Sequence, residues 1–386
     1  MTTGTKAAPG ETLDSVQALR GLAAMLVVIY HVTGVQKAEF VTGPVPALWE
    51  RGYAGVDMFF VISGFILTYI THTYARGLQT AGRFLYARAT RIYPLWWIFA
   101  AVLPAYFLLA YGTITQPGDD TLQAAGGTGG WAYVAKSLLL WPQADLPVLS
   151  VGWTLVHEVF FYLVFSLALL VRRALLPFLL AGWAGLTLAV SWLLPAAATG
   201  SSPELALATS HLTLEFIAGA FVGLAVRRRL VFLPRTLFLL GTAGFIAAMA
   251  LYTAEPMQGR LLMGRVAVYT LPCCAILYGC VTLEQQRGLT VPAWSVALGN
   301  WSYALYLAHL LVMIGVLRLF RIAGETLPEG LRPYLAVEAP GLAGNLVFSV
   351  AVIALSIAVS ALVHRHVEQP LLAFTRKIIR RPVLAS

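Results

Sequence analysis

The sequence predicts an all-α, polytopic transmembrane helical bundle. Of its 386 residues, 59% are hydrophobic and only 11% are charged, whereas soluble domains average about 25% charged residues. The mean hydropathy of +0.77 supports the same class. Long apolar runs alternate with short polar connections along the chain, which is typical of a multi-pass membrane protein. In such a chain the net charge of +9 relates to membrane topology and does not indicate nucleic-acid binding.

About ten spans are expected, each predicted by an apolar run long enough to cross a bilayer. Turn-forming and basic residues separate these runs. The runs are 16–35, 54–74, 92–111, 148–171, one ending near 195, one ending at 227, one starting after 235, one ending at 284, 296–317 and 342–363. A short apolar helix that ends at Trp141 would lie at the membrane interface.

The basic residues predict how the spans are oriented. Arginine-rich connections follow the second, fourth, sixth and tenth spans, and such connections favour the cytoplasmic side. Both termini are therefore expected in the cytoplasm. The expected organisation is a disordered cytoplasmic tail (1–13), a transmembrane domain (14–372) and a basic cytoplasmic tail (373–386). Because no small-residue cleavage site follows the first apolar run, we do not expect it to be a signal peptide.

The first span contains two ionisable residues, Arg20 and His31, at depths where lipid disfavours them. Such residues usually mark a substrate or proton path. On an α-helix their spacing places them within about 20° of one face and about 16 Å apart along the axis. His31 could act as a general base, because the pKa of imidazole lies near neutral pH. A hydrogen bond between helices would also explain a histidine at this position.

Two carboxylates, Asp57 and Glu158, occur in later spans. Asp57 is a candidate for orienting His31, although the helix dipole also favours a carboxylate near the start of a helix. Glu158 lies one turn after Thr154 and has no Lys or Arg in its own span. Because an unpaired carboxylate inside a membrane is costly, we expect Glu158 to pair with Arg20 or His31.

Arg88 and Arg91 are three positions apart and share one helix face at the expected cytoplasmic edge. Two arginines in this arrangement could bind phosphate groups in bidentate geometry. The preference for basic residues on the cytoplasmic side explains the same pair without any ligand.

Tyr303, Tyr306 and His309 recur every three residues and line one face of the ninth span. They could form a polar wall of a substrate cavity, or they could make hydrogen bonds between helices. Two further sets of residues indicate packing without chemistry. Gly219 and Gly223 have the spacing of closely packed helices, and the cysteines lack the spacing and companion histidines of a metal site. The cysteines are Cys273, Cys274 and Cys280.

Together these residues describe a membrane cavity with a candidate base, two carboxylates and a pair of arginines. The sequence contains no nucleotide-hydrolysis motif, no metal-ligand cluster and no nucleophilic serine elbow. The residues by themselves therefore indicate transfer or transport in a membrane cavity.

Several motifs resemble those of the membrane-bound acyltransferase 3 family, and they occur in the same order. The stretch QALRGLAAMLVVIYHV, in which ten residues separate an Arg from a His, is similar to the family's amino-terminal signature. The later blocks are GVDMFFVISGFILT, RFLYARATRIYPLWW with its Arg-x-x-Arg, GWTLVHEVFFY, NWSYALYLAHLL and HVEQPLL. The resemblance covers about residues 14–372, and WTLVHEVFFY resembles the exopolysaccharide O-acetyltransferase subgroup in particular.

The resemblance implies an O-acetyltransferase of the bacterial inner membrane. Its donor would be acetyl-coenzyme A or another acyl-coenzyme A, and its acceptor a carbohydrate hydroxyl of an exopolysaccharide or a lipid-linked precursor. Neither a metal nor a nucleic acid is expected. The implied roles are catalytic base for His31, motif partner for Arg20, orienting or tuning groups for Asp57 and Glu158, phosphate ligands for Arg88 and Arg91, and cavity wall for Tyr303, Tyr306 and His309.

Other interpretations stay open at this stage. The acyl group could pass directly to the acceptor or by way of an acyl-histidine. The acceptor could instead be a small glycosylated natural product such as a macrolide. A carrier for a glycolipid or polyol would also need polar residues at membrane depth, but carriers often have repeated halves, and this sequence shows no internal repeat. A purely structural subunit would not need the four ionisable residues together.

Overall fold

The computed structural model describes residues 13–40, 48–114, 129–193, 202–252, 260–337 and 342–378. All regular elements in this part of the chain are helices, which confirms the predicted all-α class. The N-terminal tail up to residue 12, most of the expected glycine-rich loop and the last eight residues lie outside the described residues. Two expected connections, 196–203 and 255–260, also lie largely outside them.

Nine helical segments of the described chain are long and apolar enough to cross a membrane. Some of them consist of two consecutive helices. They are α1 (Asp14–Glu39), α2 (Ala54–Thr71), α3 with α4 (Leu78–Ala100 and Val102–Tyr111), α8 (Leu176–Leu193), α10 with α11 (Pro203–Ala208 and Thr213–Arg227), α12 (Pro234–Leu251), α13 (Arg260–Gln285), α14 (Ala293–Thr326), and α16 with α17 (Leu342–Val363 and Gln369–Ile378).

The remaining expected span, the fourth, is α7 (Gly152–Ala168), an apolar helix of 17 residues. Its length of about 26 Å is at the lower limit for crossing the hydrocarbon core. The third span also differs from the expectation, since its helix begins at Leu78 and not near residue 92. Arg83, Arg88 and Arg91 consequently lie within α3 and not in a connection.

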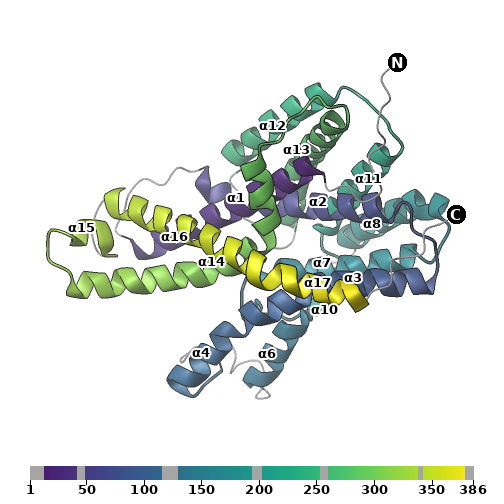
Figure 1. Ribbon diagram of the computed structural model, residues 1–386. Helices are drawn as coiled ribbons and strands as arrows, with labels where there is room; N and C mark the ends of the chain where they lie inside the picture. The colour runs from purple at the N-terminus through teal and green to yellow at the C-terminus, as the bar shows by residue number, and fades with distance from the viewer. Residues whose placement is uncertain are drawn as a thin grey trace.

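Helix α1 packs between several other helices of the bundle (Figure 1). It runs antiparallel to α2, where a Cβ atom on Gly55 would lie only 2.2 Å from the carbonyl oxygen of Ala23. It also contacts α14 closely, because a Cβ on Gly299 would lie 1.9 Å from the carbonyl oxygen of Gln17. Glycines at these crossings allow the backbones to approach, and Arg20 and His31 of α1 are therefore enclosed by neighbouring helices.

Helices α2 and α11 make a second close contact. A Cβ on Gly219 would lie 1.8 Å from the carbonyl oxygen of Val61, and a Cβ on Gly64 would lie at the same distance from that of Phe216. The packing role predicted for Gly219 is thus confirmed. The short helix α6 (Gly129–Leu139) extends with α4 away from the other helices in Figure 1.

A buried ion pair connects α2 to α13. The Arg265 guanidinium donates from Nε to Oδ1 of Asp57 at 3.0 Å and from Nη2 to Oδ2 at 2.8 Å. The two side chains are 3% and 0% exposed. Glu215 of α11 is also fully buried and interacts electrostatically with both residues. Three helices therefore meet at one buried guanidinium.

We expect Arg265→Met to lower the free energy of unfolding by about 3–5 kcal/mol, because it leaves two buried carboxyl groups without their cation. Thermal or denaturant unfolding in detergent would measure the loss. The matched control is Arg321→Met, which breaks the exposed pair between Arg321 and Glu39 and should cost less than about 1 kcal/mol. Equal losses in the two variants would contradict this account of the buried pair.

Candidate active site

Two neighbouring cavities lie inside the bundle and share part of their lining. The first, called the arginine cavity here, has a polar lining of Arg20, Ser63, Arg88, Arg91, Thr154, Glu158, Tyr162, Ser302, Tyr303 and Tyr306. The second, the histidine cavity, has a polar lining of Tyr30, His31, Tyr53, Ser150, Trp153, Arg265 and Tyr306. Tyr306 and Val56 line both cavities, so they form the wall between them.

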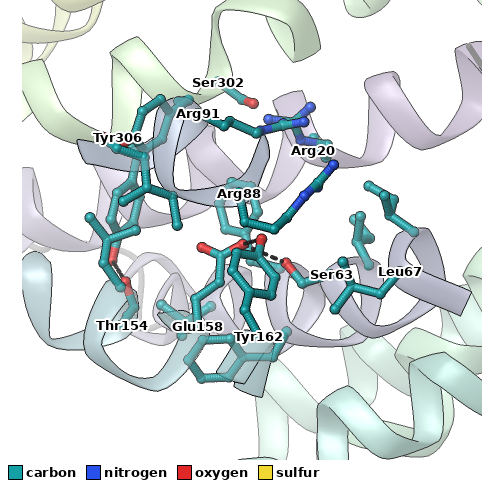
Figure 2. Close-up of a pocket in the computed structure, with 18 residues that line it drawn as sticks. Arg20, Ser63, Leu67, Arg88, Arg91, Thr154, Glu158, Tyr162, Ser302 and Tyr306 are labelled. Carbon is teal, nitrogen blue, oxygen red and sulfur yellow. Dashed lines mark hydrogen bonds between the residues drawn. The ribbon is translucent and has the colours of Figure 1, made fainter. Parts of the chain in front are cut away.

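Three arginines gather on one side of the arginine cavity (Figure 2). Arg20 comes from α1 and donates from Nη1 to the side-chain oxygen of Gln17 at 3.1 Å. Arg88 and Arg91 come from α3, and the Arg88 guanidinium lies 5.9 Å from the centre of the Tyr162 ring. The Nε atom of Arg88 is buried and has no hydrogen-bond partner among the described residues. This N–H is available to an acceptor in the cavity.

Glu158 of α7 faces these arginines from the other side of the cavity (Figure 2). Its Oε1 accepts a hydrogen bond from Ser63 Oγ at 3.2 Å and another from the Tyr162 hydroxyl. The expected direct pairing with Arg20 or His31 is therefore replaced by two hydroxyl donors. Arg20 does lie in the same cavity and is attracted electrostatically by Glu158. The Tyr162 hydroxyl reaches Glu158 because residues four apart on one helix are neighbours. It donates a hydrogen bond where a cation was expected.

The charges in the arginine cavity are unbalanced. Three guanidinium groups face one carboxylate in its lining. Guanidinium groups bind phosphates in bidentate geometry, and an enclosed site strengthens that attraction. The residues present, including the unpaired Nε of Arg88, thus have the charge and the free donor that a phosphate-bearing ligand requires.

His31 lies in the histidine cavity, and its surroundings select one tautomer. Its Nδ1 lies 2.9 Å from the carbonyl oxygen of Val27 and 3.3 Å from Nε2 of His309. His309 Nδ1 in turn lies 3.0 Å from the carbonyl oxygen of Leu305 and must donate to it, so His309 Nε2 can only accept. In the neutral state, His31 therefore holds its proton on Nδ1 and has a lone pair on Nε2. This arrangement suits a general base.

The three predicted wall residues of α14 have different surroundings. His309 is buried against His31, with ring centroids 5.0 Å apart, and it is not in the lining of either cavity. Tyr303 lines the arginine cavity and donates to the carbonyl oxygen of Ile92 at 2.7 Å. The Tyr306 hydroxyl lies 2.7 Å from Oγ1 of Thr154. The predicted polar wall is therefore formed by Tyr303 and Tyr306, whereas His309 contacts the candidate base.

Asp57 differs from its expected position. It was predicted to orient His31, but its carboxylate binds Arg265 in the buried ion pair described above. Arg265 itself lines the histidine cavity. Asp57 thus contributes to the histidine cavity indirectly, because it binds a residue of the cavity lining, Arg265. The orienting contacts of His31 come from Val27 and His309 instead.

Three residues of the site region were not predicted from the sequence: Arg265, Tyr162 and Glu368. Arg265 could have been found, because an arginine inside an apolar span is itself unusual. Tyr162 lies four residues after Glu158, a spacing that places side chains side by side. Glu368 ends a π-helical turn, η3 (His364–Glu368), and attracts Arg20. Its position could not have been predicted, because it depends on how the last span packs against α1 and α14.

The spacing between Arg20 and His31 on α1 places these two residues in different cavities. Arg20 lines the arginine cavity and His31 lines the histidine cavity. They lie on one face of α1, about 16 Å apart along its axis. A single helix therefore connects the arginine cavity with a candidate base.

No group of three or more His, Cys, Asp or Glu side chains that could hold a metal ion occurs in the part of the chain that the structure describes. The cysteines of α13 are free thiols, and two of them, Cys273 and Cys280, are buried. Their burial agrees with the packing role that the sequence indicated.

Comparisons with known proteins identify the family. The family profile described as "Acyltransferase domain" matches residues 13–365. The chain is 31% identical to the exopolysaccharide production protein ExoZ of Rhizobium meliloti, over 67% of this chain and 75% of that protein. It is 32% identical to protein 2 in the picA locus of Rhizobium radiobacter, over 39% of this chain and 78% of that protein.

A third relative is the O-acetyltransferase OatA of Staphylococcus aureus, which is 28% identical over 41% of this chain but only 24% of its own length. No solved structure matches the chain significantly. The family match covers most of the sequence, and the apolar helices agree with the membrane location of such enzymes. The chain belongs to the acyltransferase 3 family and is a multi-pass membrane acyltransferase.

Proposed function

We propose that this enzyme transfers an acetyl or other short acyl group from acyl-coenzyme A to a carbohydrate hydroxyl, in an exopolysaccharide or its lipid-linked precursor. The observation that supports this best is the pair of adjoining cavities, with Arg20 in one and His31 in the other. The similarity to ExoZ, an exopolysaccharide production protein, supports the acceptor class, and the similarity to OatA, an O-acetyltransferase, supports the O-acetyl transfer.

In this proposal the donor phosphates bind in the arginine cavity. Arg20, Arg88 and Arg91 supply the positive charge that attracts the phosphates, and the Glu158 carboxylate offsets part of this charge. The thioester arm then extends along α1 toward the wall formed by Tyr306 and Val56. Such positioning converts an encounter of two substrates into a reaction between neighbours.

The acceptor enters the histidine cavity, which is the roomier of the two, with an open volume of about 230 Å³ against about 80 Å³. Its lining includes the polar residues Tyr30, Tyr53, Ser150 and Arg265. These groups suit the alternating donors and acceptors of a sugar. His31 Nε2 would face the hydroxyl that reacts.

The chemical step follows from the tautomer of His31. Nε2 removes the proton of the acceptor hydroxyl as its oxygen attacks the thioester carbonyl carbon. The C–S bond breaks, an ester forms, and the coenzyme A thiolate can take the proton back from His31. Val27 and His309 both accept from Nδ1–H, so they stabilise the imidazolium that forms. Transfer through an acyl-histidine would use the same Nε2 lone pair.

The proposed function also includes an orientation of the chain in the membrane. Both termini, with tails 1–13 and 373–386 flanking a transmembrane domain at 14–372, would lie in the cytoplasm, and the membrane would be the bacterial inner membrane. Arg20 lies near the start of α1, so the arginine cavity would be closer to the cytoplasmic supply of acyl-coenzyme A.

His31→Ala should reduce coenzyme A release by about 10²–10⁴-fold, the usual contribution of a general base. The assay follows free coenzyme A from acetyl-coenzyme A and cell-envelope glycan in detergent, with mass spectrometry of the ester product. His211→Ala is the control, because His211 is not in the lining of either cavity. Wild-type turnover in His31→Ala would show that His31 is not the base.

His309 is expected to position His31, and two substitutions separate this role from simple packing. His309→Gln keeps a side-chain oxygen that can accept from His31 Nδ1, whereas His309→Leu has no acceptor. We expect kcat to fall by about tenfold more in the Leu variant, with KM for the donor unchanged in both. A comparable fall in both variants would assign His309 a packing role only.

Arg88→Gln and Arg91→Gln should each weaken the use of acetyl-coenzyme A by about tenfold or more, because each removes a charged contact to phosphate. S-acetylpantetheine lacks these phosphates, so its turnover should change little. Arg83→Gln is the control, since Arg83 is on the same helix but is not a lining residue. If the variants kept the wild-type preference for acetyl-coenzyme A over S-acetylpantetheine, the phosphates would bind elsewhere.

A further inference from the structure

A second group of basic residues lies outside both cavities, at the end of the bundle where α2, α7 and α11 end. It consists of His72, Arg76, Arg173, Arg227 and Arg228, and is called the end cluster here. A hydrogen bond from the Gly77 amide to the carbonyl oxygen of Leu169, 3.0 Å long, joins the start of α3 to the end of α7. Arg76 directly precedes Gly77 and lies close enough to Arg173 for their charges to interact.

Two of these arginines donate hydrogen bonds to backbone carbonyl oxygens. Arg227 donates from Nε to the carbonyl oxygen of Tyr69 at 2.7 Å, and its guanidinium lies 3.7 Å from the centre of the Tyr69 ring. Arg173 donates from Nη2 to the carbonyl oxygen of Tyr74 at 3.3 Å. Cations are expected at helix C-termini, where they bind the last carbonyl groups and favour the helix dipole. These two residues therefore need no ligand.

Arg76 has no such partner. All three nitrogens of its guanidinium are buried, and none has a hydrogen-bond partner among the described residues. Burial and the neighbouring Arg173 lower the pKa of Arg76. Burial and the surrounding arginines, of which Arg173 has the largest effect, likewise lower the pKa of His72. The charges that act on these two groups are all positive, and a buried unpaired cation is costly.

The preference for basic residues on one side of a membrane explains why arginines occur here, but it does not explain a buried guanidinium without a partner. We propose that the end cluster binds a phosphate group, with Arg76 as its bidentate ligand and Arg173 and Arg228 beside it. Helix ends of a membrane protein lie at the level of the lipid headgroups. The phosphate could therefore belong to an anionic phospholipid or to the nucleotide part of an acyl-coenzyme A donor.

The experiment measures binding of two chemically defined ligands by the full-length protein. Phosphatidylglycerol is compared with phosphatidylcholine in nanodiscs, with bound lipid counted by native mass spectrometry. Adenosine 3′,5′-bisphosphate is titrated in detergent and followed by thermal shift. Arg76→Gln should weaken binding of one of these ligands by about tenfold, and Arg76→Lys by less. Arg235→Gln is the matched control, because Arg235 is an exposed arginine at the start of α12.

The binding results distinguish a lipid site, a donor subsite and the absence of a phosphate site at Arg76. Selective loss of phosphatidylglycerol binding identifies a lipid site, and selective loss of bisphosphate binding identifies a donor subsite. The proposal is overturned if neither ligand binds more weakly to Arg76→Gln, or if Arg235→Gln has the same effect. Both measurements are independent of acyl transfer, so they remain informative even if the proposed function is wrong.

Stability without ligand provides a second test, since a purely structural arginine would behave differently. Removing an unpaired cation that neighbouring arginines repel should leave the melting temperature of the ligand-free protein unchanged or raise it. A clear fall in the melting temperature of Arg76→Gln would mean that Arg76 has a structural partner, and it would refute the phosphate site.

Discussion

Ionisable side chains inside a membrane bundle have to be enclosed by protein, because lipid cannot solvate them. This constraint accounts for most of the internal architecture. Asp57 and Arg265 neutralise each other where α2 meets α13, and hydroxyl groups satisfy Glu158 in the arginine cavity. The close glycine crossings of α1 with α2 and α14 bring enough protein around Arg20 and His31 to separate them from lipid. The cavities exist because polar groups need such enclosure.

In the proposed mechanism, the two cavities divide the requirements of acyl transfer between them. One concentrates positive charge and suits a donor with several phosphates, and the other presents an imidazole whose tautomer is set by Val27 and His309. Tyr306 belongs to both linings, and its hydroxyl group is held by α7. Because a single helix contributes Arg20 and His31, the distance between these two side chains depends little on how the other helices move.

The arginines of the two cavities and of the end cluster have different surroundings. Those of the arginine cavity face a carboxylate, Arg265 is paired within the core, and two of the end cluster, Arg173 and Arg227, bind backbone carbonyls. Arg76 differs because none of its three guanidinium nitrogens has a hydrogen-bond partner among the described residues, and this is why we propose a ligand for it. A net charge by itself would not have distinguished these groups, since all of them count equally toward it.

Composition and hydropathy determined the fold class, and the helical period placed Arg20 and His31 on one face, because both depend only on local sequence. The small-residue spacing likewise predicted the packing of Gly219. The partners were decided by tertiary structure. Asp57 binds Arg265 and not His31, and His309 contacts the candidate base and is not in the lining of either cavity. Such pairings depend on which helices meet and at what height, and a one-dimensional pattern of apolar residues contains no information about either.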